Sequence, residues 1–165
     1  MRTRGSERCL ATAAGSGTLK GMSQATYDDV NLILRLYELR REDKLRQARN
    51  WFFANFKAKT MAEFQQLCPP GSEPNAFFRQ CSSYWDMAAS FVNAGVLSQD
   101  LFFANSREML LVWIRVQPLL AEARASFQDP KYMGNLETAA AAFIEWLNRT
   151  SGPGTYEAFV KRIGG

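Results

Sequence analysis

Apolar residues recur at helical spacing along most of the chain. At the start of the ordered pattern, Val30, Ile33, Leu34 and Tyr37 lie three to four positions apart, and this period predicts an α-helix that begins at Thr26. Three further leucines widen the apolar stripe of this segment. A stripe of that width predicts a helix that is buried on more than one side.

The same period predicts the other helices. We expect them at about residues 45–56, 60–67, 74–94, 99–127, 136–150 and 155–163. Pro118 lies inside the longest of these segments, and it predicts a kink or a break because proline removes a backbone hydrogen bond.

Capping residues mark several of the helix boundaries. The predicted positions are Thr26 with Asp29 and Thr60 with Glu63 as capping boxes, Gly95 as a left-handed C-terminal cap, and Ser98 as an N-terminal cap. No segment shows sustained alternation of apolar and polar residues, so the pattern predicts no strand.

The domain organisation follows from these elements. Residues 26–165 are predicted to form a single all-α bundle of five or six helices, with the segments 74–94 and 99–127 as its central pair. Residues 1–25 are rich in Gly, Ser, Thr and Ala without a period, so we expect a disordered tail. Met22 offers an alternative start, so residues 1–21 are either native or a misassigned or cloned extension.

The composition supports a globular domain, and most of the net positive charge lies near the N-terminus. Of the 165 residues, 47% are hydrophobic and 13% aromatic, which is enough for a core without disulfides or a metal. The net charge is +4, of which residues 1–21 carry +3. Since the remaining chain carries only +1, a nucleic-acid partner is not favoured.

The histidine and cysteine counts narrow the chemistry further. The chain has no histidine, which excludes serine–histidine and cysteine–histidine catalysis and removes the commonest metal ligand. Cys9, Cys68 and Cys81 are odd in number and lack CxxC spacing, so reduced thiols in a reducing, cytoplasmic compartment are favoured over a Cys68–Cys81 disulfide. We predict no catalytic, cofactor or metal residue. No uncharged run is long enough for a membrane span.

The folded part has one basic region, residues 35–59, with a net charge of +5. Aromatic residues lie among the basic ones, and Arg46, Arg49 and Trp51 are the candidates for contact with phosphates and bases or with an acidic partner. The alternative, which we favour, is a solvated helix edge over an aromatic core.

Asp86 is the most unusual carboxylate, because it lies in an otherwise apolar predicted helix. Arg79, Arg115 or Arg124 could pair with it, and such a pair in a pocket would suit a small-molecule sensor or an enzyme that uses carboxylate and arginine chemistry. A structural ion pair or a surface acid is the favoured reading.

Several short blocks together carry a family resemblance. They are Ala48–Phe52, Ser83–Asp86, Asn93–Leu101 and Val112–Pro118 followed by Arg124. In their order they resemble a family of small all-helical bacterial domains of unknown function, over about residues 27–147. Asp86 stands where that family often has Glu. The resemblance implies a helical bundle and a bacterial source, and it assigns no activity.

The sequence therefore leaves three functional hypotheses. The favoured one is a non-enzymatic interaction or accessory module in a bacterial cell, acting through a protein partner or a second copy of the chain. The others are a binder of nucleic acid or an acidic partner through residues 35–59, and a sensor or enzyme with carboxylate and arginine chemistry.

Overall fold

A computed structural model of the chain describes residues 24–163, and this part is all-helical. In chain order its elements are α1 (Tyr27–Arg41), α2 (Asp43–Asn55), α3 (Met61–Leu67), α4 (Glu73–Asn93), α5 (Gln99–Asn105), α6 (Glu108–Val116), the 3₁₀ turn η1 (Gln117–Leu119), α7 (Leu120–Phe127), α8 (Gly134–Ser151) and α9 (Thr155–Ile163). The predicted all-α class is confirmed, whereas five or six helices is too few. The predicted tail lies almost wholly outside the described residues.

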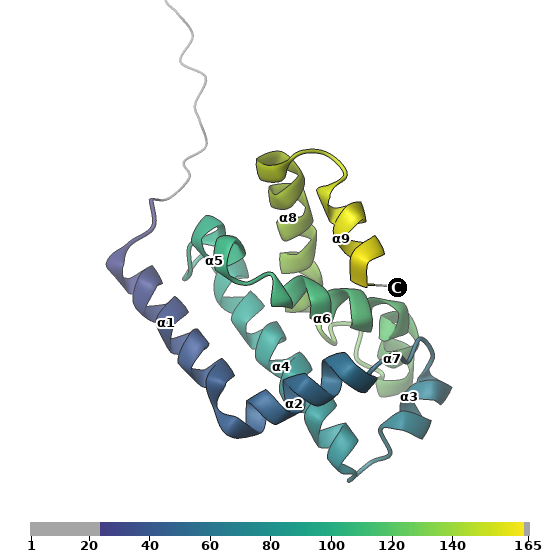
Figure 1. The fold of residues 1–165 in the computed structure, drawn as a ribbon. Coiled ribbons are helices and arrows are strands. Elements are labelled where there is room, and N and C mark those ends of the chain that lie inside the picture. The colour runs from purple at the N-terminus through teal and green to yellow at the C-terminus, as the bar shows by residue number, and fades with distance from the viewer. Residues whose placement is uncertain (1–23, 164–165) are drawn as a thin grey trace, which may run out of the picture.

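Helix α4 lies at the centre of the fold. It runs through the middle of the molecule, with α2 and α8 as the helices that contact it most extensively (Figure 1). Helix α9 packs on α8. The predicted central pair is therefore wrong, because the second member of that pair does not exist as one helix.

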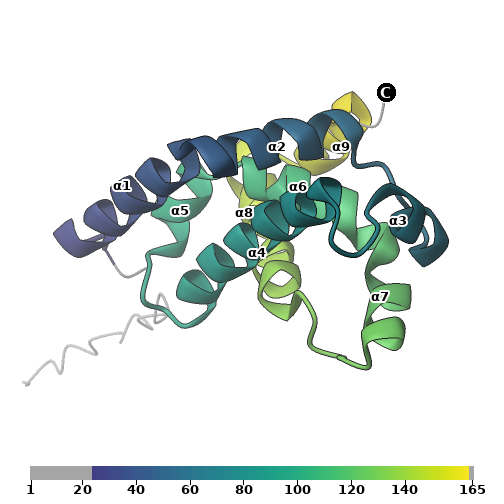
Figure 2. The same ribbon diagram turned by 90° about the horizontal axis from the view of Figure 1, so that it is seen from below.

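The segment 99–127 is broken twice. Helix α5 ends at Asn105 and α6 begins at Glu108, although no glycine or proline marks this break. At Pro118 the chain passes through η1, and α7 then leaves at a steep angle to α6 (Figure 2). Pro118 thus splits the predicted helix: its missing N–H is accommodated by a single 3₁₀ turn.

Aromatic side chains fill much of the core, as the helical stripes predict. Phe56 and Phe78 lie 4.8 Å apart between ring centroids, and Phe52 stacks on Phe56 at 4.9 Å. On the other side of α4, Phe103 stacks on Phe143 at 4.3 Å. These rings are almost completely buried, so they combine area burial with favourable aromatic geometry. Cys68 and Cys81 are buried, free thiols.

Helix α1 is the exception to this burial. It buries only Asp29 and Leu36, while Val30, Leu34 and Tyr37 are exposed. The prediction that α1 is buried on more than one side is therefore wrong. A single narrow face of the helix is buried against the rest of the domain, and the apolar residues on the opposite side are exposed.

The predicted capping box at Thr26 is present, whereas the one at Thr60 is only half formed. The Thr26 hydroxyl accepts from the Asp29 N–H at 3.2 Å, and the Asp29 carboxylate accepts from the Thr26 N–H at 2.7 Å. Thr60 accepts from the Glu63 N–H, whereas the Glu63 carboxylate accepts from the Lys59 N–H rather than from Thr60.

The end of α4 also follows the prediction, but the start of α5 does not. Gly95 has φ +71°, and the Val96 N–H donates to the Phe91 carbonyl, which completes a Schellman motif. The Ser98 side chain does not cap α5. Instead the Ser98 backbone N–H donates to Asp29 Oδ1 at 2.6 Å, so a carboxylate of α1 satisfies this donor at the start of α5.

This arrangement recurs at two other helices. Three carboxylates accept a backbone N–H at the start of a distant helix: Asp29 from Ser98 at 2.6 Å, Asp86 from Leu136 at 2.9 Å and Glu122 from Met61 at 2.7 Å. The positive end of a helix favours a carboxylate at that position, so these contacts hold separate helices in register. No helix within residues 24–163 has the length and apolar character needed to cross a membrane.

Candidate functional site

The six residues proposed from the sequence do not form one site. Arg46 lies on the surface of α2, where it donates to the Arg41 carbonyl at 2.8 Å and pairs with Asp43 at 3.4 Å. Trp51 is half-buried on the same helix and packs against Phe77, with 6.0 Å between the two ring centroids. Arg46 thus contacts neighbouring residues of the chain, whereas Trp51 packs against α4.

Arg115 and Arg124 join neighbouring elements. Arg115 donates to the Phe56 carbonyl at 3.3 Å. Arg124 donates to the Tyr132 carbonyl at 3.1 Å and to the Glu137 carboxylate at 2.7 Å. Each guanidinium therefore satisfies groups of the fold itself.

Asp86 caps α8. Besides the Leu136 N–H it accepts from the Asn135 side chain at 3.2 Å, and no arginine of the described chain lies within 4 Å of its carboxylate. Asp86 and Arg79 line the same shallow groove of about 630 Å³. Because both carboxylate oxygens already accept hydrogen bonds at the start of α8, this acid has a structural task.

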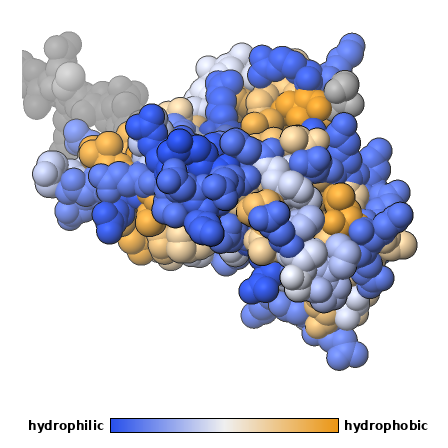
Figure 3. Space-filling model, turned by 60° about the horizontal axis from the view of Figure 1, so that its bottom comes forward, coloured by the Kyte–Doolittle hydropathy of each residue, from blue (hydrophilic) through white to orange (hydrophobic). Residues whose placement is uncertain are grey.

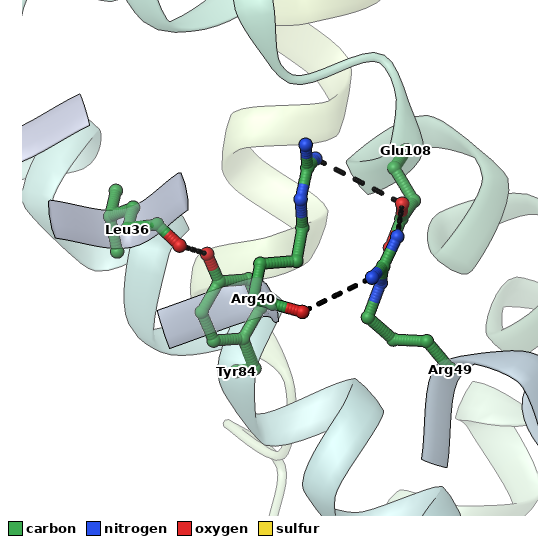
Figure 4. A network of polar contacts seen from close by, with 5 residues as sticks. All are labelled: Leu36, Arg40, Arg49, Tyr84 and Glu108. Carbon is green, nitrogen blue, oxygen red and sulfur yellow. Dashed lines mark hydrogen bonds and ion pairs between the residues drawn. The ribbon is translucent and has the colours of Figure 1, made fainter. Parts of the chain in front are cut away.

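Arg49 belongs to a polar network between α1, α2, α4 and α6 (Figure 4). It donates two hydrogen bonds to Glu108, and a third to the Arg40 carbonyl at 3.2 Å. The Tyr84 hydroxyl donates to the Leu36 carbonyl at 2.7 Å. The network thereby fixes the second half of α1 against α4 and α6.

Charge in this network is not balanced. Arg40 approaches Glu108 only to 3.9 Å, while Arg49 takes both carboxylate oxygens. The Arg40, Arg49 and Glu108 side chains are 18, 20 and 15% exposed, so solvent screens them only in part. The hydrogen-bonded Glu108 carboxylate raises the pKa of Arg49, so this guanidinium stays charged. Two cations and one anion leave a net charge of +1.

A small pocket adjoins the network. It has a volume of about 250 Å³ and lies between α1, α4 and α5. The walls are formed mainly by apolar and aromatic residues: Ile33, Leu34, Leu36, Tyr37, Tyr84, Trp85 and Phe102. The Arg40 side chain and the residues at the end of α5, Asn105 and Ser106, supply its polar part.

The polar groups of the pocket are held in place by aromatic rings. The Arg40 guanidinium lies 5.1 Å from the Tyr37 ring centroid and 5.9 Å from that of Trp85. Burial raises the pKa of Tyr84 to about 12, so its hydroxyl stays protonated and keeps its bond to α1 at neutral pH. The pocket wall is therefore organised without any ligand.

The exposed face of α1 continues from this pocket. Tyr27, Val30, Leu34 and Tyr37 follow the spacing of one helix face, and Leu34 and Tyr37 also line the pocket. Tyr27 is 79% and Leu34 54% exposed. Figure 3 shows hydrophobic surface over the first part of α1 and hydrophilic surface where α1 meets α2. We call these four residues together with the pocket the α1 groove.

Sequence reasoning did not find the α1 groove. The apolar period of α1 was visible, but period alone does not tell a buried face from an exposed one. Glu108 is 59 positions from Arg49 in the chain, so their pairing had no local signal. In the described chain no cluster of three or more potential metal-binding side chains occurs.

Comparison with known proteins places the chain in a family. The profile of a family described as "Domain of unknown function (DUF4760)" matches residues 25–146, and the chain belongs to this family. The match runs from the start of α1 into α8 and confirms the resemblance inferred from the sequence. No curated protein and no solved structure matches the chain.

Proposed function

We propose that the domain is a non-enzymatic docking module that binds a short acidic segment of a partner protein in the α1 groove. The observation that carries this proposal is the unpartnered apolar face of α1, which continues into a preformed pocket. Exposed apolar surface that is continuous with a cavity is typical of interaction sites.

The size of the pocket favours a side chain over a free ligand. Small-molecule sites commonly have volumes of roughly 300–1,000 Å³. A pocket of about 250 Å³ is below that range and suits one large apolar side chain. The exposed stripe of α1 would then contact the flanking residues of the same segment.

The charge around the groove favours an acidic segment. Arg41 and Lys44 have no carboxylate within 4 Å among residues 24–163, and Arg40 belongs to a network with an excess positive charge. Such positions attract an acidic partner and steer its approach.

The area of α1 disfavours a second copy as the occupant. A helix of fifteen residues is about 22 Å long and about 10 Å wide, so one face presents a footprint of roughly 220 Å². A stable interface buries about 800 Å² per partner. A symmetric dimer built on α1 alone would therefore be weak, whereas a short segment that fills the pocket needs less area.

Nucleic acid fits the structure less well than an acidic peptide. Of the aromatic residues in the basic region, Phe52 and Phe56 are fully buried, so they cannot stack on bases. Arg49 is committed to Glu108.

The free thiols Cys68 and Cys81 support a reducing compartment, and we infer that the module works in the bacterial cytoplasm.

Selection from a displayed library of random peptides tests this proposal. The full chain is the target, and Leu34→Glu is the disrupting variant, because Leu34 is exposed and lies on both the stripe and the pocket wall. Val96→Glu is the matched control, since Val96 is an exposed apolar residue outside α1. We expect enriched peptides to combine an aromatic or large aliphatic residue with acidic ones. Their affinity should fall roughly tenfold or more for Leu34→Glu and stay unchanged for Val96→Glu.

Two outcomes would contradict the proposal. One is that no peptide is enriched on the wild-type chain. The other is that the enriched peptides bind Leu34→Glu as well as the wild type, which would place their site elsewhere.

A further inference from the structure

We propose that the pocket between α1, α4 and α5 recognises an apolar group that carries a carboxylate, and that Arg40 is the residue that binds this carboxylate. The inference rests on the proposed function in that it names the chemistry of the group that enters the α1 groove. The carboxylate belongs either to the docked peptide or to a free small organic acid.

Arg40 has unused hydrogen-bonding capacity. A guanidinium has five N–H donors. In the described chain the closest acidic contact of this side chain is Glu108 at 3.9 Å, beyond hydrogen-bonding distance. A carboxylate in the pocket would take two of these donors in the bidentate geometry that arginine favours.

The charge beside the pocket also favours a carboxylate. The Arg40–Glu108–Arg49 cluster has one anion for two largely buried cations. One further carboxylate would balance it. A cationic group would add to the excess positive charge, and a doubly charged phosphate would exceed the one cation that lines the pocket.

Arg40 is also preorganised for binding. The rings of Tyr37 and Trp85 hold the Arg40 guanidinium, and the Tyr84–Leu36 hydrogen bond holds the helix that carries it. Binding therefore immobilises little that is not already fixed, which favours affinity for a small group.

The test compares three probes that share one apolar body. 3-Phenylpropanoate carries the carboxylate, 3-phenylpropanamide is its neutral isostere, and 3-phenylpropylamine carries the opposite charge. Each is titrated into the full-length, isotope-labelled chain and followed by amide chemical shifts and Trp fluorescence. We expect saturable binding of the carboxylate with shifts in α1, α4 and α5, roughly tenfold tighter than the amide, and no binding of the amine.

Variants locate the charge partner. Arg40→Met keeps the apolar stem and should remove the advantage of the acid over the amide. Arg40→Lys keeps the charge but loses the paired guanidinium donors, so it should retain only part of the advantage of the acid over the amide. Arg35→Met is the control, because Arg35 is an exposed arginine of the same helix that pairs with Glu38. If Arg40→Met does not fold, the comparison of acid and amide on the wild-type chain still decides the question.

The inference is overturned if acid and amide bind equally, if the shifts lie outside the pocket, or if no probe binds saturably. Peptides ending in phenylalanine, with a free C-terminus or a C-terminal amide, distinguish the two sources. Peptides that bind with and without a carboxylate would refute this inference and leave the docking module intact. A free acid that binds while no peptide does would support the inference and refute the docking module.

Discussion

The pair formed by Arg49 and Glu108 allows a quantitative prediction. Removing one partner of a fully buried ion pair costs about 3–5 kcal/mol, and an exposed pair contributes about 0.2–1 kcal/mol. With side chains 15–20% exposed and two hydrogen bonds between them, this pair lies between these limits. We expect Glu108→Leu to lower the free energy of unfolding by about 2 kcal/mol, and Arg49→Met by a similar or smaller amount.

The double variant should cost less than the sum of the two single variants. Removing both partners leaves no unpaired charge of this pair, so the coupling energy should be about 1–2 kcal/mol. Urea denaturation followed by circular dichroism measures all four members of the cycle. For a domain of this size, 2 kcal/mol corresponds to a shift in Tm of about 4–8 °C.

A low coupling energy in this double-mutant cycle would refute the expected strength of the pair. A coupling energy below about 0.5 kcal/mol would show that solvent screens the pair as it does an exposed one. Partial burial would then not strengthen the pair, and Arg40 would not stand in a poorly screened site. Arg35→Met serves as the exposed reference, because its partner Glu38 lies on the surface.

Three further predictions follow from other contacts. Tyr84→Phe removes the buried hydrogen bond to Leu36 and should cost about 1 kcal/mol, with hydrogen exchange accelerated in α1 more than in α8. Asp86→Ala should destabilise the domain by about 1 kcal/mol in thermal unfolding, whereas Asp86→Asn keeps an acceptor for the start of α8 and should lose less. The hydrogen bonds from Thr26 and Ser98 lower the pKa of Asp29, so its stabilising effect is present above its unfolded-state pKa of about 3.9 and is lost as the pH falls through its folded-state value. Stability curves measured from neutral to acidic pH should therefore fall less steeply for Asp29→Asn than for the wild type.

Local signals predicted much of the fold. The capping box at Thr26, the glycine end of α4 and the periodic apolar residues of α2 and α8 all depend on neighbours within one or two turns, so the sequence shows them directly. The break between Asn105 and Glu108 was missed, because apolar residues continue at helical spacing across it and no glycine or proline marks it.

The candidate site was much less predictable. The arginine content of residues 35–59 was evident, but which arginine is neutralised depends on Glu108, far along the chain. Asp86 looked chemically unusual in its apolar helix, and its structural role was hidden because the start of α8, which it caps, is 50 residues away. The α1 groove depends on which face of α1 meets α4, and this is a property of assembly that periodicity does not encode.

The three carboxylates that cap distant helices have a consequence for folding. Asp29, Asp86 and Glu122 reach helix starts that are 69, 50 and 61 positions away. Nucleation is the unfavourable step in forming a helix, and here it is assisted by groups that arrive only when the tertiary structure assembles. At the starts of α3, α5 and α8, one backbone N–H each therefore gains its carboxylate acceptor only in the assembled fold. Contacts over such long sequence separations form only with the tertiary structure, so we expect the helices to form together in one cooperative transition.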